Sequence, residues 1–181
     1  MDRRYNVITS QFHSDETLQE ILNKITKRER GIKKKVLRSV IILAVEISRE
    51  GREGRKIGTM FVIGDEKNVL RSSHTLILDP LKGHPGDVKK IDDPNFRETI
   101  KELAQLDGAF IVSGEGVVIS AARYIIANTK GITIPLGLGS RHIAAVAISK
   151  NTDAVAVVVS ESSVVRIIAD GIIISEIIPK L

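Results

Sequence analysis

Three short segments near the end of the chain are apolar at almost every position, and they constrain the fold more than any other feature. They cover 154–159, 164–169 and 172–177, with Asp170 and Gly171 forming a turn between the last two. A strand with one solvated face alternates apolar and polar residues, whereas a continuous apolar run is typical of a strand with helices on both sides. These segments therefore predict a sheet that lies between two layers of helices.

Further elements are predicted from apolar periodicity and from the turn residues between them. Short apolar runs predict strands at 57–63, 75–78, 109–112 and 117–122, the last two forming a hairpin. Helical spacing predicts helices that begin with a cap at Ser14, cover 36–45, run from Asp93 to about 105, and run from a cap at Ser140 to 150. We therefore expect an α/β fold in which helices flank a mixed β-sheet. The predicted organisation is an N-terminal helical segment at 1–31 and a single domain at 32–181.

Composition narrows the class of protein. With 181 residues, 43% of them hydrophobic and 3% aromatic, the chain can form one domain with a core of Ile, Val, Leu and Ala. The absence of cysteine excludes disulfides, thiolate zinc sites and cysteine nucleophiles. No signal sequence opens the chain, and the apolar run at 40–45 is far shorter than the ~20 residues of a membrane-spanning helix. These features predict a soluble, cytoplasmic protein with no membrane partner.

Positive charge is concentrated near the N-terminus. The net charge is +5, and the stretch 24–38 contains eight Lys and Arg residues but a single acid, Glu29. Such a stretch either binds nucleic acid or an anionic membrane surface, or forms the solvated ends of helices. Because no aromatic residue lies among the basic ones, we favour helix ends over nucleic-acid binding.

The segment GLGSRH at 137–142 has the composition of an anion-binding turn. Glycines allow the backbone close to a ligand, and the free N–H groups at the start of a helix point toward a negative charge. Arg141 adds a bidentate donor and His142 adds another. The alternative is an ordinary capped helix with Arg and His at the surface. The motifs GxxxxGK[ST], GxGxxG, HExxH and GxSxG are absent from the sequence.

A second candidate is the tripeptide Asp107-Gly108-Ala109, at the junction of a predicted helix and a predicted strand. An Asp at the head of an apolar strand either forms a turn or directs its carboxylate into a cleft. Beside a phosphate-binding turn, such a carboxylate can hold the divalent cation that nucleotide chemistry requires. Both interpretations stay open on these residues alone.

Three motifs, in this order, resemble the diadenylate cyclase (DAC) domain family. They are DGA at 107–109, GSRH at 139–142 and VVVSE at 157–161. The signatures of the family are written DGA and RHR, and the likeness extends over 36–177. The resemblance implies an enzyme that joins two ATP molecules into cyclic di-AMP and releases pyrophosphate.

The resemblance also implies roles for individual residues. Asp107, Arg141 and His142 are the implied catalytic residues, and Asp107 is implied to bind Mg²⁺ or Mn²⁺ and to help activate the ribose 3′-hydroxyl. The residues implied to contact ATP are Gly108, Ala109, Ile125, Gly139, Ser140, Arg141, His142, Ser160 and Glu161. The reaction of the family needs two domains face to face, each presenting one ATP. A homodimer or a higher homo-oligomer is therefore the implied working unit.

Three features depart from the family's pattern. Ile143 replaces the second Arg of RHR, and Ser162 stands where one membrane-bound branch has a second Glu. The hairpin after Asp107 is one residue longer than in that branch. The charge lost at Ile143 motivates an alternative function, a sensor of the same fold that binds ATP or cyclic di-AMP without turnover. A nucleic-acid or scaffold-binding module that uses 24–38 is a second alternative.

Overall fold

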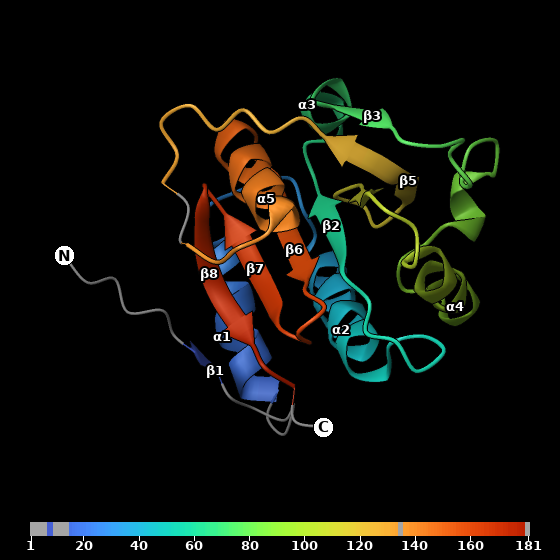
Figure 1. Ribbon diagram of the computed structural model, residues 1–181, viewed down its shortest axis with the longest axis horizontal. Coiled ribbons are helices and arrows are strands. Elements are labelled where there is room, and N and C mark those ends of the chain that lie inside the picture. The colour runs from blue at the N-terminus through green and yellow to red at the C-terminus, as the bar shows by residue number, and fades with distance from the viewer. Residues whose placement is uncertain (1–6, 9–14, 134–135, 180–181) are drawn as a thin grey trace.

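In the described part of the chain, eight strands form one mixed sheet at the centre of the molecule (Figure 1). The computed structural model describes residues 7–8, 15–133 and 136–179. The strands are β1 (Val7–Ile8), β2 (Thr59–Ile63), β3 (Ser73–Thr75), β4 (Ala109–Val112), β5 (Val118–Ile125), β6 (Val155–Val159), β7 (Val165–Ala169) and β8 (Ile172–Ile177). Their order across the sheet is β1-β8-β7-β6-β2-β4-β5-β3. The predicted mixed sheet is thus confirmed.

Helices cover both faces of this sheet. They are α1 (Asp15–Thr26), α2 (Lys34–Glu50), α3 (Glu66–Arg71), α4 (Pro94–Leu103) and α5 (Ser140–Asn151), with a short 3₁₀ helix at Gly86–Val88. Buried residues of α1, α2 and α4 share one core with one face of the sheet, and those of α3 and α5 share a second core with the other face. In Figure 1, α1 and α2 lie behind the sheet and α5 lies in front of it.

The strands in the middle of the sheet supply alternate side chains to the two cores. In β2, Phe61 and Ile63 belong to the core under α2, whereas Met60 and Val62 belong to the core under α5. All five residues of β2 and all five of β6 are buried. The continuous apolar runs of the sequence therefore have the cause that we expected, a sheet covered on both sides.

The helix predicted from Asp93 is confirmed, and its cap is visible. The side chain of Asp93 accepts a hydrogen bond from the backbone N–H of Phe96 at 2.8 Å, and Pro94 occupies the first helical position. The prediction of a cap at Ser140 is wrong, because Ser140 is the first residue of α5 and Gly139 is the N-cap residue. The cap predicted at Ser14 lies outside the described residues.

The strand predicted at 75–78 is displaced toward the N-terminus. β3 pairs with β5 over Ser73–Thr75, and Leu76, Ile77 and Leu78 are 45%, 50% and 94% exposed. The ladder stops where the next partner in β5 is Ala122, whose φ of +52° interrupts the extended backbone. The sequence pattern also misses α3, because its six residues contain a single buried side chain, Val69.

The N-terminal helix α1 is packed onto the domain. Its apolar residues Leu18, Ile21, Leu22 and Ile25 are each 1% exposed, in the same core as α2. The proposed division of the chain at residue 31 stays a prediction. Among the described residues, no helix is both long enough and apolar enough to cross a membrane.

The basic stretch at 24–38 faces acidic groups of the same chain. Arg28 forms ion pairs with Asp153 and Asp170, and Arg30 forms one with Asp170. Further along, Lys33 pairs with Glu115 and Lys35 with Asp92. Much of the positive charge of this stretch is thus balanced within the molecule, which agrees with the interpretation as helix ends.

The connection between α1 and α2 is held against the β4–β5 turn. A Cβ added at Gly114 would lie 2.0 Å from the carbonyl oxygen of Gly31, and Lys33 donates its N–H to the Gly114 carbonyl at 3.0 Å. We expect Gly114→Ala to lower the free energy of unfolding by about 1–3 kcal/mol, because backbone must move to relieve the clash.

Urea denaturation measures this loss, with Gly86→Ala as the matched control. A Cβ at Gly86 would meet its nearest neighbour, a methyl group of Val117, at an ordinary 3.6 Å. Equal stability of the two variants would show that the connection is not held at Gly114.

Candidate active site

The residues singled out in the sequence meet at one edge of the sheet. β2 and β4 run parallel, so Gly58 and Asp107 precede the two strands at the same edge. β6 runs antiparallel to β2, with Val159 opposite Thr59, so Ser160 and Glu161 follow β6 at this edge as well. The N-terminus of α5 reaches the same edge, because its second residue, Arg141, forms ion pairs with Asp107 and Glu161.

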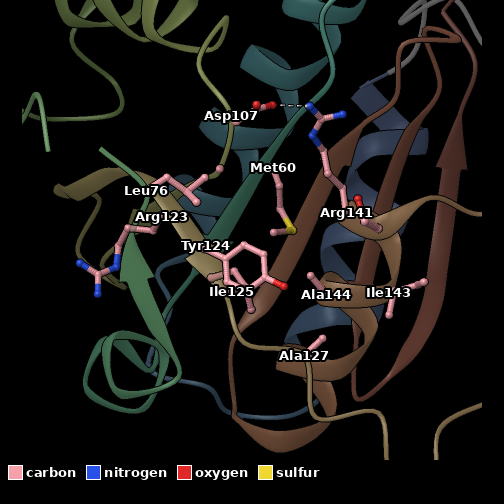
Figure 2. A pocket seen from close by; sticks show the side chains of 12 residues that line it. Met60, Leu76, Asp107, Arg123, Tyr124, Ile125, Ala127, Arg141, Ile143 and Ala144 are labelled. Atoms are coloured by element: carbon pink, nitrogen blue, oxygen red, sulfur yellow. Dashed lines mark ion pairs between the residues drawn. The ribbon is translucent and has the colours of Figure 1, made fainter. Parts of the chain in front are cut away.

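Arg141 lies between two carboxylates. Its Nη2 is 3.5 Å from Oδ1 of Asp107, and its Nη1 is 3.4 Å from Oε1 of Glu161. Figure 2 shows the first of these pairs at one end of a pocket. The side chains of Asp107 and Glu161 are 89% and 71% exposed, so both carboxylates stay accessible to a ligand or a cation. Pairs at this distance and exposure are weak and are readily exchanged for a stronger partner.

Gly58 provides the space in which Arg141 lies. A Cβ at Gly58 would be 2.5 Å from Nη1 of Arg141 and 3.2 Å from Cγ of Glu161. The backbone of Gly58 does not have a positive φ, so its conformation is open to other residues. The glycine is therefore needed for the close approach of Arg141 and not for a turn.

Gly108 is required by the backbone itself. Its φ is +104°, and an added Cβ would lie 2.6 Å from the carbonyl carbon of Ala122. The contact is tight because β5 has a bulge here, where Ala109 pairs with Arg123 but Ile111 pairs with Ser120. A bulge takes up one extra residue and turns the following side chains to new directions. It therefore helps to aim the end of β5 at the pocket.

The start of α5 has the features of an anion site. Gly139 is the N-cap residue, so the N–H groups of Ser140 and Arg141 begin the helix without an intrahelical acceptor. A Cβ at Gly139 would meet no atom within 4 Å, so the space beside the cap is open. Together with the Arg141 guanidinium, these groups suit a phosphate.

His142, predicted as a further donor beside Arg141, is not a surface residue. It is 6% exposed, and its Nε2 lies 3.0 Å from Nη1 of Arg166 in β7. Burial, followed by the positive charge of Arg166, lowers the pKa of His142 from its ordinary value to about 4. The ring is therefore neutral at pH 7, and one of its nitrogens is already occupied within the protein.

Two pockets share the start of α5. A pocket of about 480 Å³ is lined by the residues drawn in Figure 2: Met60, Leu76, Asp107, Gly108, Arg123, Tyr124, Ile125, Ala127, Ser140, Arg141, Ile143 and Ala144. A pocket of about 340 Å³ is lined by 137–142, by 158–162 and by Arg166. We call these the apolar pocket and the anion pocket. Ser140 and Arg141 line both, so the two pockets adjoin at the start of α5.

Nearly all of the predicted site residues line one of the two pockets. The apolar pocket contains Asp107, Gly108 and Ile125, which is 3% exposed. The anion pocket contains the predicted residues of α5 and of the β6 end: Gly139, Ser140, Arg141, His142, Ser160 and Glu161. Ala109 is fully buried at the start of β4 and lines neither pocket. Ile143 faces the apolar pocket, so the position at which the family has a second Arg forms part of an apolar wall here.

The carboxylates at this site fit a cation that is bound partly by the protein and partly by a ligand. Within the described part of the chain, no cluster of three or more His, Asp or Glu side chains could hold a metal by itself. Asp107 nevertheless offers an exposed carboxylate, and Mg²⁺ in nucleotide sites is commonly held by one or two carboxylates, substrate phosphates and water. The residues present therefore fit a metal that arrives with its nucleotide.

Sequence reasoning missed several of these residues. Gly58 could not be found, because its function depends on where Arg141 lies in the fold. Arg166 does have a signal, since it is a single charged residue within the apolar run 164–169. Tyr124 lines the apolar pocket from the end of β5, beyond the strand predicted at 117–122, and Met60 lies in a predicted strand that gives no sign of which side chains face a pocket.

The arrangement is that of a nucleotide-binding α/β domain, and comparison with known proteins gives its family. The model of the DAC family, described as DisA bacterial checkpoint controller nucleotide-binding, matches residues 46–173. A curated diadenylate cyclase of Methanocaldococcus jannaschii is 48% identical over 166 residues, which are 91% of this chain and 51% of that protein. A curated diadenylate cyclase of Haloferax volcanii is 39% identical over 147 residues, 80% of this chain and 53% of that protein. The chain belongs to the DAC family, and it spans about half the length of these curated relatives.

Solved structures agree on the fold. DacA from Staphylococcus aureus, in the form of a double mutant, superposes with a TM-score of 0.51 at 24% identity, covering 77% of this chain and 85% of that one. A hypothetical membrane spanning protein from Bacillus cereus gives a TM-score of 0.55 at 21% identity, covering 74% and 59%. At these identities the likeness concerns the fold alone.

We expect Gly58→Ala to displace the Arg141 guanidinium and to weaken nucleotide binding about tenfold, the typical effect of losing a hydrogen bond to a charged group. The free energy of unfolding should change by no more than about 1 kcal/mol, because only the end of a flexible side chain has to move. Calorimetric titration with an ATP analogue and urea denaturation measure the two quantities.

A double-mutant cycle gives the control for this prediction. If Gly58 acts through Arg141, then Gly58→Ala has no further effect on affinity in the Arg141→Ala background. Additive losses in the double variant would show that Gly58 does not act on this arginine.

Proposed function

We propose that the protein is a diadenylate cyclase, which condenses two ATP molecules into cyclic di-AMP and releases two pyrophosphates. The observation that carries the proposal is the position of Arg141. It lies between two exposed carboxylates, at the junction of an apolar pocket and an anion pocket. Membership of the DAC family and the names of the curated relatives support the same activity.

The two pockets suggest how ATP would bind. The adenosine would occupy the apolar pocket beside Ile125, Met60 and Tyr124, and the phosphates would enter the anion pocket at Ser140 and Arg141. Backbone N–H groups at the start of α5 and the Arg141 guanidinium would hold the negative charge. Phosphoryl transfer asks a protein mainly for such positioning and for charge stabilisation.

Asp107 is the residue proposed to hold Mg²⁺ or Mn²⁺. The metal would neutralise charge on the phosphates during attack. Binding of a nucleotide would exchange partners at the site, with Arg141 leaving its long contact to Asp107 for the phosphates and leaving the carboxylate free. The carboxylate of Asp107 would also be placed to draw the proton from a ribose 3′-hydroxyl.

The reaction requires two copies of the site. Each 3′-oxygen bonds to the α-phosphorus of the other ATP, the bond to pyrophosphate breaks, and the hydroxyl proton is lost. Because one chain provides one Asp107 and one Arg141, a second chain must present the other ATP across a two-fold axis. Leu76 and Tyr124 line the apolar pocket and are 45% and 50% exposed, and the exposed Ile77 and Leu78 follow Leu76 along the chain. These apolar residues would form the contact between the two chains.

One observation favours a second candidate, a sensor that binds ATP or cyclic di-AMP without turnover. Ile143 removes a positive charge from the site and forms an apolar wall. Such a sensor would bind nucleotide with the same residues but would form no product in the presence of Mg²⁺ or Mn²⁺.

Substitution of the carboxylate tests the proposed metal site. We expect Asp107→Asn to lower the rate of cyclic di-AMP formation by at least about a hundredfold, since it removes the anion and keeps the shape. The melting temperature should stay at the wild-type value, because the side chain is exposed. The product is measured by mass spectrometry, with Asp92→Asn as an exposed control far from the site. Wild-type rates for Asp107→Asn would contradict the proposal.

Dilution tests the proposed pairing of sites. We expect Leu78→Asp to raise the dissociation constant of the dimer about tenfold or more, because Leu78 is 94% exposed, two residues after the pocket residue Leu76, and a charge opposes its burial. Specific activity should then fall at protein concentrations at which the wild type is still active, and should recover at higher ones. Ile172→Asp is the matched control. Ile172 is 48% exposed on β8, which lies near the edge of the sheet opposite to β3. Activity of Leu78→Asp that matches wild type at every dilution would exclude this surface.

A further inference from the structure

Arg166 is a charged residue in the middle of a buried strand. Its neighbours Val165 and Ile167 are fully buried in the core under α2. Because side chains alternate along a strand, Arg166 points to the opposite face, which is covered by α5. Its side chain is 15% exposed, so its contacts come mainly from within the protein.

The guanidinium of Arg166 has two defined partners. Its Nε donates to Oε1 of Glu176 at 2.9 Å, and the two residues are opposite each other in the β7–β8 ladder. Its Nη1 lies 3.0 Å from Nε2 of His142 at the start of α5. Glu176 is 18% exposed and therefore holds the guanidinium in place from the strand side.

The contact with Arg166 determines which nitrogen of His142 carries the proton. A guanidinium has donors but no acceptor, so Nε2 of the imidazole must be the acceptor of this bond. A neutral imidazole has one N–H, which leaves the proton on Nδ1. The lowered pKa of His142 agrees with a neutral ring.

Arg166 and His142 both line the anion pocket, together with Ser140 and Ser160. His142 is the third residue of α5, so a fixed ring also fixes the first turn of the helix against β7. The guanidinium brings a permanent positive charge to this pocket, in a chain that has Ile143 at the position where its family has an arginine.

We propose that Arg166 is a positioning residue of the anion pocket. Held by Glu176, it fixes His142 as a neutral ring with its proton on Nδ1, and it thereby holds the start of α5 in the orientation that binds phosphate. The inference rests on the proposed function for the identity of the ligand, but the contact between the two side chains can be tested without any ligand.

The state of His142 is measured by NMR on the whole chain labelled with ¹⁵N, in correlation spectra that distinguish the two nitrogens of each imidazole. His142→Gln identifies the signals by their loss. In the wild type we expect the proton on Nδ1. In Arg166→Met we expect a mixture of the two tautomers, and in Arg166→Lys, which retains a donor, a return toward the Nδ1 form.

Calorimetric titration with α,β-methylene-ATP tests whether the contact between Arg166 and His142 affects ligand binding. We expect Arg166→Met to bind about tenfold more weakly than wild type, and Arg166→Lys to bind with intermediate affinity. Arg97→Met is the matched control, because Arg97 is 16% exposed in an ion pair with Glu46 between α4 and α2. This control should lose stability without a change in the His142 signals or in affinity.

Two results would overturn the inference. One is a wild-type His142 with its proton on Nε2, and the other is an Arg166→Met variant that keeps the wild-type tautomer and affinity. Failure of the wild type to bind the analogue would instead contradict the proposed function, while the NMR result would still decide the role of Arg166.

Discussion

The pairing of β2 with a parallel neighbour on one side and an antiparallel neighbour on the other decides where the site lies. The parallel β4 brings Asp107 to the edge at which β2 begins, and the antiparallel β6 ends at that same edge with Glu161. α5 leads directly into β6 along the chain, so its N-terminus arrives beside both carboxylates. If β6 were parallel to β2, the residues that follow it would lie at the opposite edge, and Arg141 could not lie between the two acids.

The ion pairs at this edge are loose enough for a ligand to replace them. Arg141 contacts both carboxylates at distances near 3.5 Å, and Gly58 leaves the space for it. Such loose pairs stabilise the free protein little, so a phosphate or a metal can replace them at small cost. Arg166 is in a different situation, because it is largely buried and bonded to Glu176 and His142. In the roles proposed above, Arg141 changes partners when a ligand binds, whereas Arg166 supports the start of α5, which carries Arg141.

Most of the fold, and several of the residues that meet at the two pockets, could be predicted from sequence, for identifiable reasons. The apolar runs of β6, β7 and β8, and the capping pair at Asp93 and Pro94, are local signals that the structure confirms. Asp107 and 139–142 were selected because their residue types suit a cation and an anion, and the structure brings them to the same edge of the sheet. Their catalytic and binding roles stay predictions. The order of strands and the place of Gly58 could not be predicted, since both depend on contacts between distant segments. The inward turn of His142 was missed because it depends on Arg166, 24 residues further along.

The central claim is that this site joins two ATP molecules and does not merely bind them. Its most direct test is incubation of the chain with ATP and either Mg²⁺ or Mn²⁺, followed by mass spectrometry of the nucleotides and an assay of pyrophosphate. The proposed mechanism predicts cyclic di-AMP, with two pyrophosphates released for each molecule formed. A chain that binds ATP at this site but returns it unchanged with both metals would contradict the claim and leave the sensor in its place.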